Sequence, residues 1–353
     1  MWIMDVQSWR GRDYMLRVGL TKGRPEVSGF SWTALVGFIC LALASLCLGQ
    51  QTFVGTHGRL SVKGNKIVDR NGTPTTLHGM SLYCWAPQGK KFFNTTAIGH
   101  LAHDWKCTVI RIAVLPRDYK NNPTDELNRV KTVIDGCIAN GIYAIVDWHA
   151  MGGAQNDVAS AQSFFSALAT AYGKTPNVMY EPWNEPVQES WDAIKAYHEA
   201  LISKIRAIDP DNIIICGSRH WDQEIAEASE NPIRSPNIAY SIHFYAATHR
   251  QSLRDNGARA LKNGVALFAT EYGTSSASGG GAYDPAETQL WWNWLDENNI
   301  GSANWSVAAL EETSAAFQPG ASETGPWTDD MLKPSGLLVR NYIAGKYTLP
   351  QAR

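Results

Sequence analysis

The sequence predicts an α/β protein that folds as one closed (β/α)8 barrel, a TIM barrel, preceded by a short β-hairpin. Eight short apolar stretches with strand character alternate with helical stretches between residues 77 and 305. The strand stretches are apolar at consecutive positions, which is typical of parallel strands buried on both faces. After the first of them, Gly79-Met80-Ser81-Leu82 lacks the G-x-G-x-x-G turn that a doubly wound sheet usually carries. A barrel of this type needs about 250 residues, which the chain provides.

The individual elements are expected in order along the chain. Residues 60–62 and 66–68 alternate around Gly64 and Asn65, which predicts the hairpin. The barrel strands are expected at residues 77–82, 109–113, 143–147, 178–180, 213–217, 238–244, 266–270 and 302–305. Helices are expected between them, among others at residues 125–140, 159–172, 191–208 and 285–298. No linker, low-complexity run or internal repeat interrupts this pattern, so residues 50–353 are predicted to form a single domain.

Residues 1–49 differ from the rest of the chain. Five basic residues precede residues 33–49, which carry no charge and end in small residues before Gln50. A basic segment followed by an apolar one predicts a secretory signal peptide over residues 1–49. The alternative is a signal anchor that stays in the membrane, although 17 residues are marginal for a hydrocarbon core of about 30 Å. We therefore expect a secreted, extracellular protein that has no membrane contact after cleavage.

Charge and cysteine content narrow the function classes. Residues 50–353 contain 26 basic and 30 acidic residues, a net charge of −4, with no Lys/Arg block, so no nucleic-acid partner is expected. The four cysteines of this part, Cys84, Cys107, Cys137 and Cys216, fit no zinc pattern. Cys107 and Cys137 are both expected at the bottom of the barrel and are the one disulfide pair predicted. The alternative is that all four are reduced and buried as small apolar residues.

Polar and aromatic side chains recur where the predicted strands end. The active site of such a barrel is built at the carboxyl ends of its strands, so these residues are expected around one mouth. They are Arg111, Asp147, Trp148, His149, Asn184, Glu185, Trp221, His243, Phe244, Tyr245, Glu271 and Trp305. Each alone could be a packing or rim residue. Together they bring carboxylates, imidazoles, a guanidinium, an amide and aromatic rings to one place.

Two of these side chains indicate a chemistry. No H-E-x-x-H motif, aspartate cluster or Cys/His spacing points to a metal, and no Gly-rich phosphate cradle appears, so no metal or cofactor is expected. Two carboxylates at a barrel mouth, here Glu185 and Glu271, can hydrolyse a glycosidic bond. One protonates the leaving oxygen, and the other attacks the anomeric carbon or activates water. The 14 tryptophans fit a sugar substrate, because the apolar face of a pyranose stacks on a flat ring.

The chain resembles glycoside hydrolase family five over about residues 57–345. The resemblance is carried by Asn184-Glu185-Pro186, Thr270-Glu271 before Gly273, Arg111, Asp147-Trp148-His149, His243-Phe244-Tyr245 and Asn304-Trp305. The runs AIDPDNIII (207–215), HFYAATH (243–249) and SAAFQPGAS (314–322) are similar to its bacterial-type endoglucanase branch, which is also seen in plant-parasitic nematodes.

This resemblance implies a retaining double displacement. Glu185 would be the acid/base and Glu271 the nucleophile. Arg111 and Tyr245 would donate hydrogen bonds to Glu271 and keep it ionised. Asn184 would bond the 2-hydroxyl of the sugar, a contact that strengthens in the transition state.

The resemblance also implies supporting and substrate-binding residues, which are His149, His243, Trp85, Trp221, Trp305 and Glu312. The two histidines would orient carboxylates and hydroxyls, and Trp305 would form the floor of the cleavage subsite. Three departures from the family pattern stand out. Tyr272 follows the nucleophile where a Trp is usual, Leu310 replaces a Lys two residues before Glu312, and residues 83–85 do not clearly match the family's His and stacking Trp.

The implied activity is that of a secreted endo-β-1,4-glucanase, a cellulase, whose partner is a β-glucan polysaccharide. An endo-β-mannanase or a mixed-linkage glucanase could use the same residues. A secreted carbohydrate-binding effector with weak hydrolysis is the alternative from another class. A monomer is expected.

Overall fold

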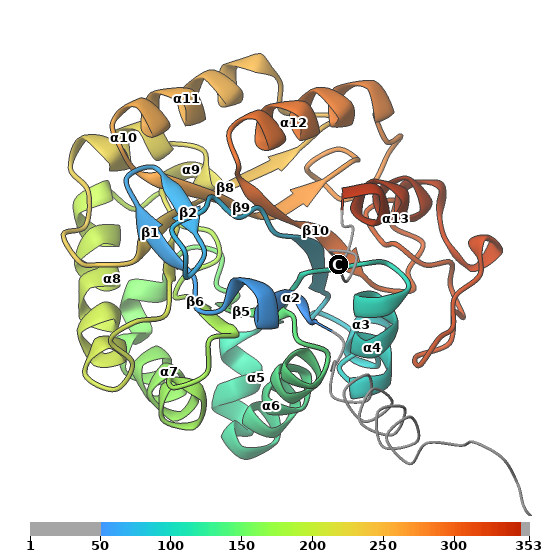
Figure 1. Cartoon of the computed structure of the whole chain (residues 1–353), viewed down its shortest axis with the longest axis horizontal. Coiled ribbons are helices and arrows are strands. Elements are labelled where there is room, and N and C mark those ends of the chain that lie inside the picture. Colours follow the sequence, from blue (N-terminus) through green and yellow to red (C-terminus); the bar gives the residue numbers. More distant parts are fainter. Residues whose placement is uncertain (1–50, 347–353) are drawn as a thin grey trace, which may run out of the picture. The chain divides into compact units, whose positions relative to one another are not determined.

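The computed structural model describes residues 51–346, and their eight parallel strands close into a barrel (Figure 1). The strands are β3 (His78–Leu82), β4 (Val109–Val114), β5 (Tyr143–Trp148), β6 (Val178–Glu181), β7 (Ile214–Cys216), β8 (Ile238–Tyr245), β9 (Ala266–Gly273) and β10 (Gly301–Val307). Each pairs with its sequence neighbour, and β10 pairs with β3 to close the ring. The predicted fold class is confirmed, and the strand ends differ from the prediction by up to three residues.

Helices surround the barrel on its outer side (Figure 1). The four predicted ones are α6 (Pro123–Ala139), α7 (Val158–Tyr172), α8 (Trp191–Arg206) and α12 (Pro285–Glu297). The others are α2 (Phe53–His57), α3 (Pro87–Lys90), α4 (Thr95–His103), α5 (Pro116–Asn121), α9 (Arg219–Asp222), α10 (Ile225–Glu230), α11 (Gln251–Lys262) and α13 (Pro334–Lys346), with 3-10 turns η1 (Ala154–Asp157) and η2 (Asp329–Met331). Helix α8 illustrates why such segments form helices that pack on the barrel. The Ser190 side chain caps its first turn by accepting from the Ala193 N–H, and its buried side chains recur every three or four residues.

Apolar side chains fill the N-terminal end of the barrel. Alternate residues of the strands face the interior, and there they form one cluster. Its strand-borne members are Val109, Tyr143, Ile145, Met179, Ile215, Ala239, Ala266 and Phe268, joined by Leu77 and Ile213 just before β3 and β7. Helix α2 and the hairpin of β1 (Ser61–Lys63) and β2 (Lys66–Val68), which was also predicted, add Val54, Leu60 and Ile67 to the same cluster. The N-terminal segment thus covers this end of the barrel (Figure 1).

The predicted disulfide is wrong. Cys84, Cys107, Cys137 and Cys216 are free thiols, and all four are buried. Cys107 and Cys137 are both members of the large apolar cluster between the barrel and its helices. Burial raises the pKa of both thiols far above its ordinary value. The two residues therefore pack as small apolar side chains, which was the alternative considered from the sequence.

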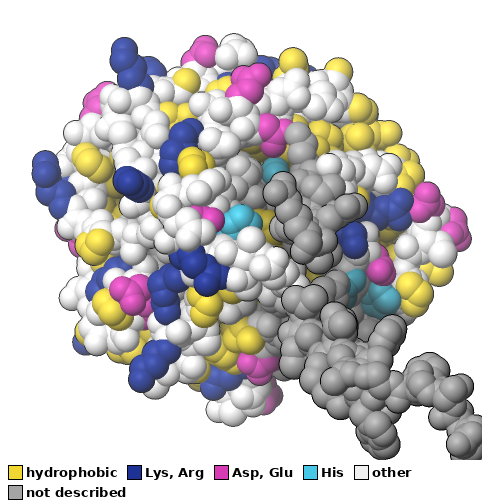
Figure 2. Space-filling model, viewed as in Figure 1, with side chains coloured by type: hydrophobic (Ala, Val, Ile, Leu, Met, Phe, Trp, Pro, Cys, Tyr) yellow, Lys and Arg dark blue, Asp and Glu magenta, His cyan; other side chains and the backbone are white. Residues whose placement is uncertain are grey.

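The predicted signal peptide, residues 1–49, lies outside the described residues. Within residues 51–346, no helix combines the length and the apolar character needed to cross a membrane. On the face that carries the hairpin, Lys and Arg side chains are interspersed with Asp and Glu (Figure 2). This mixture agrees with the small net charge of the sequence.

Candidate active site

Two adjoining pockets open at the carboxyl ends of the barrel strands. The first, of about 390 Å³, is lined by Met151, Glu185, Trp221, Gln223, His243, Tyr245, His249 and Ala277. The second, of about 300 Å³, is lined by Tyr83, Trp85, His149, Met151, Tyr245, Glu271, Ala277, Ser278, Gly279, Trp305 and Glu312. Because the pockets share Met151, Tyr245 and Ala277, they form one cleft. Glu185 lies in one part of the cleft and Glu271 in the other.

The turn after β6 is fixed by backbone pairing with the segment after β5. The Asn184 N–H donates to the Trp148 carbonyl at 3.0 Å, and the Glu185 N–H donates to the Ala150 carbonyl at 3.0 Å. The Gly152 N–H in turn donates to the Glu185 carbonyl at 2.8 Å. Prolines on either side of this turn restrict its backbone further. The turn therefore holds a carboxyl and an amide at the mouth of the barrel with little freedom to move.

Glu271 is held by the two donors expected from the sequence. Arg111 Nη1 donates to Glu271 Oε2 at 2.9 Å, and the Tyr245 hydroxyl donates to Glu271 Oε1 at 2.7 Å. The register between β8 and β9 shifts at this level, from Ser241 opposite Phe268 to His243 opposite Glu271. Such a bulge re-aims side chains, and here it brings two successive residues, Thr270 and Glu271, into the buried network.

Arg111 is the hub of this network and is completely buried. Its guanidinium donates to Glu181 (2.7 and 3.1 Å), Glu271 (2.9 Å) and Asn184 (2.6 Å), and it forms an ion pair with Asp147 at 2.9 Å. The bond to Asn184 uses the amide oxygen, so the orientation of that amide is fixed. Burial alone would raise the pKa of Glu181, but the Arg111 charge outweighs it and lowers that pKa to about 2. The guanidinium therefore keeps Glu181 ionised beneath the cleft.

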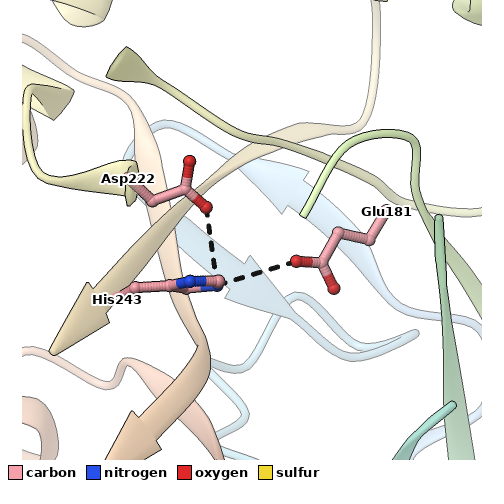
Figure 3. A group of neighbouring side chains, drawn as sticks. All are labelled: Glu181, Asp222 and His243. Carbon is pink, nitrogen blue, oxygen red and sulfur yellow. Dashed lines mark ion pairs between the residues drawn. The ribbon is translucent and has the colours of Figure 1, made fainter. Parts of the chain in front are cut away.

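His243 connects the Glu185 side of the cleft with a second buried acidic group. Its Nδ1 lies 2.9 Å from Glu185 Oε1, and its Nε2 lies 2.9 Å from Thr270 Oγ1. The same Nε2 lies 3.4 Å from Asp222 Oδ2 and 3.8 Å from Glu181 Oε1, so two carboxylates flank it (Figure 3). The neighbouring carboxylates raise the pKa of His243 against the effect of burial.

Aromatic rings line the part of the cleft beside Glu271. The His149 ring stacks on Trp305 with ring centres 5.0 Å apart, and the edge of Trp85 meets it at 5.9 Å. His149 Nδ1 lies 2.7 Å from Asp147 Oδ2, which fixes the plane of the imidazole. Burial lowers the pKa of His149 to about 4, so this ring is neutral at neutral pH. Trp85, which had no clear counterpart in the family pattern, therefore does reach the cleft.

At the rim, Trp221 is 39% exposed and Met151 is 53% exposed, so both present apolar surface to the first pocket. Glu312 lines the second pocket, and burial raises the pKa of its carboxyl. Leu310, which replaces the family's Lys, is half-buried. Lys333 donates instead to the Glu312 carbonyl at 2.9 Å, so a cation approaches Glu312 from another part of the chain.

Nine of the residues predicted from the sequence line the cleft, which are Trp85, His149, Glu185, Trp221, His243, Tyr245, Glu271, Trp305 and Glu312. Arg111 and Asn184 are buried in the hydrogen-bond network that holds Glu271. Trp148 and Phe244, which were also expected at the mouth, pack instead in the apolar cluster between the barrel and its helices. Sequence reasoning missed four buried members of the network, which are Asp147, Glu181, Asp222 and Thr270. Asp147 and Thr270 are the last residues of predicted strands, and Glu181 follows a predicted strand directly. These three could have been found from their place at strand ends. Asp222 is the last residue of the short helix α9, and no pattern in the sequence points to it.

Two groups of acidic and imidazole side chains have the spacing of metal ligands, which are Glu181 with Asp222 and His243, and Glu185 with His243 and Glu271. Both depend on His243, whose two nitrogens already lie at hydrogen-bond distance from Glu185 and Thr270. The arrangement is that of a hydrogen-bonded proton-transfer network. One oxygen of Glu185 and one of Glu271 lie within 4.8 Å of each other. Carboxyls about 5–5.5 Å apart are typical of retaining glycosidases, and inverting ones space them by about 6.5–9.5 Å.

A barrel with two carboxylates facing a cleft lined by aromatic rings defines a glycoside hydrolase. Residues 68–310 match the model of the cellulase family, glycosyl hydrolase family 5. The chain belongs to this family.

Relatives and solved structures agree with this assignment. The chain is 42% identical over 308 residues to Endoglucanase Z of Dickeya dadantii, covering 85% of this chain and 70% of that protein. It is 40% identical over 302 residues to an endoglucanase of Clostridium saccharobutylicum, covering 83% and 67%. The structure matches the catalytic domain of Thermobifida fusca endoglucanase Cel5A with a TM-score of 0.80 and 34% identity, over 83% of this chain and 99% of that domain. A substituted form of that domain, solved in complex with cellotetraose, matches with a TM-score of 0.79.

Proposed function

We propose that the chain is a secreted, retaining endo-β-1,4-glucanase that hydrolyses internal bonds of cellulose or a related β-glucan. The observation that carries this proposal is the pair Glu185 and Glu271, whose oxygens approach within 4.8 Å between two adjoining pockets. The names of the relatives support β-1,4-glucan as the substrate, as does the cellotetraose bound by a neighbouring structure.

Glu271 is the nucleophile in this proposal. Arg111 and Tyr245 each occupy one of its oxygens as donors, which holds the carboxylate in one orientation toward the cleft. Attack on the anomeric carbon breaks the glycosidic bond and forms a covalent glycosyl ester with Glu271. Water then hydrolyses this ester, and the configuration at the anomeric carbon is retained overall.

Glu185 is the acid in the first step and the base in the second. It protonates the leaving oxygen and later removes a proton from the attacking water. Asn184 is fixed through its oxygen by Arg111, which leaves its NH₂ group free to donate to the sugar 2-hydroxyl. Sugars on the two sides of the scissile bond occupy the two pockets. Trp305 and Trp85 provide the stacking surface in one pocket, and Trp221 provides it in the other.

Secretion is part of the proposal and rests on the basic and apolar composition of residues 1–49. Expression in a eukaryotic secretory host tests it. The expected product is extracellular and begins near Gln50. A product retained in the membrane fraction at full length would show that the segment is a signal anchor.

Reducing-end release from three polysaccharides tests the activity. Carboxymethylcellulose, galactomannan and barley β-glucan should be supplied in parallel to the protein and to Glu271→Gln as the matched inactive control. We expect release from carboxymethylcellulose, with a rapid fall in viscosity that marks internal cleavage. The highest rate on galactomannan would identify a mannanase instead. Binding to one of these polysaccharides, with no release of reducing ends from any of the three, would identify a carbohydrate-binding effector.

A further inference from the structure

Asp222 is a buried carboxyl that the proposed reaction does not use. Its side chain is completely shielded from solvent. Oδ1 accepts from the Ser218 N–H at 2.7 Å, and the carboxyl also accepts from the Ser241 hydroxyl. The nearest opposite charge is His243 Nε2, which lies 3.4 Å from Oδ2 (Figure 3). A fully buried carboxyl destabilises the fold unless it is paired or has another use.

The backbone that carries Asp222 is strained as well. His220, Trp221 and Asp222 all have left-handed dihedral angles, with φ of 51°, 56° and 61°. Each costs about 1–2 kcal/mol for a residue with a Cβ, so three in succession need a compensating interaction. The Trp221 N–H donates to the Pro186 carbonyl at 2.9 Å, next to Glu185. The strained turn thus presents Trp221 to the cleft and Asp222 to His243 while it is attached to the backbone that carries Glu185.

The position of one proton on His243 follows from the network. The Thr270 hydroxyl has a single hydrogen, which it donates either to Glu181 Oε1 at 2.8 Å or to the Ser241 hydroxyl at 2.5 Å. Thr270 Oγ1 can therefore only accept from His243 Nε2, which lies 2.9 Å away. The Nε2 atom must carry a proton. Whether Nδ1 also carries one decides the charge of the ring and the direction of its bond to Glu185.

The two states of Nδ1 have opposite effects on Glu185. If the ring is an imidazolium, the Nδ1–H donates to Glu185 Oε1, and the acidic proton of Glu185 must reside on Oε2. If the ring is neutral, the Nδ1 lone pair attracts the Glu185 proton onto Oε1, where it is hydrogen-bonded to the ring and turned away from Oε2. Only the first state leaves the proton available on the oxygen that is free to face a leaving group.

We infer that Asp222 is a positioning residue that keeps His243 in the imidazolium form and thereby keeps the acidic proton of Glu185 on Oε2. The inference rests on the proposed acid role of Glu185. Asp222 acts through its charge on Nε2 and does not touch the substrate.

Other groups also face this pair. Glu181 and Glu185 approach His243 from β6 and the following turn, Glu271 and Thr270 from β9, and the Ser241 hydroxyl faces Asp222 from β8. His249 also lies near His243, and burial together with the His243 charge lowers the pKa of His249. Burial raises the pKa of Asp222 to about 8, so this carboxyl ionises as the solution becomes alkaline. At a pH where the His243 imidazolium would otherwise lose its proton, Asp222 carries a negative charge that keeps the proton on the ring. The activity should therefore persist to higher pH.

The pH profile of Asp222→Asn with two matched substrates tests this inference. Phenyl β-cellobioside needs protonation of its leaving group, whereas 2,4-dinitrophenyl β-cellobioside does not. For the variant, we expect the alkaline limb of kcat/KM with the phenyl substrate to move to lower pH by about one to two units. With the dinitrophenyl substrate, kcat/KM should stay within about twofold of the unsubstituted protein at every pH.

Two controls separate this inference from other causes. Asp209→Asn removes another fully buried carboxyl, which bonds Tyr180 and Asn212 far from the cleft, and should lower stability without moving the limb. Glu185→Ala should slow the phenyl substrate and spare the dinitrophenyl one. Equal effects of Glu185→Ala on the two substrates would refute the acid role of Glu185, whatever the result for Asp222→Asn. Equal losses with both substrates in Asp222→Asn, or an unmoved limb, would overturn the inference.

A measurement on the unsubstituted protein keeps the inference testable even if Asp222→Asn does not fold. In ¹⁵N spectra of protein labelled in its histidine rings, the His243 nitrogens should both show protonated shifts above pH 8, where Asp222 is ionised. A His243 ring that is already neutral just above pH 8 would contradict the inference.

Discussion

The two ends of the barrel interior are built by the same strands but have opposite chemistry. At the N-terminal end, Val109, Tyr143 and Met179 form a dry apolar cluster that α2 and the hairpin cover. Two residues further along β4 and β6, the same inward direction is taken by Arg111 and Glu181, which are fully buried and charged. The first end stabilises the fold through apolar burial. The second holds more carboxylates than cations, and it retains them only through a closed set of ion pairs and hydrogen bonds.

This difference indicates which substitutions should affect activity and which should affect stability. A substitution at the charged end should remove activity, whereas a substitution at the apolar end should remove stability and leave the activity of the folded protein unchanged. The following predictions test that division, from the largest effect to the smallest.

The first prediction concerns the two carboxyls of the cleft. Glu271→Gln removes the nucleophile and Glu185→Gln removes the acid/base, so each should lower turnover by about 10²–10⁴-fold or more. Both variants keep the size of the side chain and should unfold at nearly the same denaturant concentration as the unsubstituted protein. For Glu271→Ala, added azide should restore turnover and give a product of inverted configuration. Near-normal turnover in either Gln variant would refute the assignment.

Substitution of Arg111 tests whether the buried carboxylates of the charged end depend on this guanidinium for their stability. Arg111→Met leaves Asp147, Glu181 and Glu271 without their cation, which should lower the free energy of unfolding by about 3–5 kcal/mol as well as abolish activity. Urea unfolding measures the change. Lys120→Met is the control, because Lys120 pairs with Asp157 where both side chains are accessible to solvent, and this change should cost about 1 kcal/mol or less. Equal losses in the two variants would show that the buried network contributes little.

Met179 tests the apolar end. It is 2% exposed within the cluster under the hairpin, so Met179→Ala should lower the free energy of unfolding by about 2–5 kcal/mol. Glu181 lies two residues further along the same strand, yet kcat/KM of the folded variant should be unchanged. A large loss of kcat/KM at a temperature where the variant is fully folded would show that the two ends are coupled.

Buried histidines give the stability a pH dependence. Burial lowers the pKa of His149, at the charged end, and of His198, on α8, to about 4, against an ordinary value of 6.5. The unfolded chain therefore binds protons that the folded protein does not, and stability is lost as the pH falls from about 6.5 toward 4. Each histidine contributes a slope of up to about 1.4 kcal/mol per pH unit.

His198→Gln isolates one of these contributions. Urea unfolding at pH 7 and pH 5 should show a smaller loss for this variant, whereas His103→Gln, at an exposed position in α4, should behave like the unsubstituted protein. An unchanged loss in His198→Gln would mean that His198 is protonated in the folded state.

Most of the fold and the two carboxyls of the cleft could be predicted from the sequence because most of the strands contain a short apolar run and polar residues stand at or just after the ends of several of them. The end of β9 was placed three residues too early, because the chain turns polar at Thr270 and Glu271 while a bulge keeps both in the sheet. The contact between Asp222 and His243 could not be predicted, because it depends on consecutive left-handed residues without a glycine. The disulfide was predicted wrongly because element order places two cysteines at one end of a barrel but does not orient their side chains.

The smallest effect is expected from the thiols, which lie beside the charged end and in the apolar layer between the barrel and its helices. Cys84 lies beside the charged end, and Cys107 and Cys137 lie in the apolar core, yet all are free and at most 1% exposed. Reductant should therefore leave the unfolding midpoint unchanged, and a thiol reagent should label residues 50–353 only at the rate of unfolding. Peptide mapping without reductant should find no linked pair. A Cys107–Cys137 peptide, with a lower midpoint after reduction, would show that the two side chains come within bonding distance in the folded protein, and would contradict their packing as separate apolar side chains.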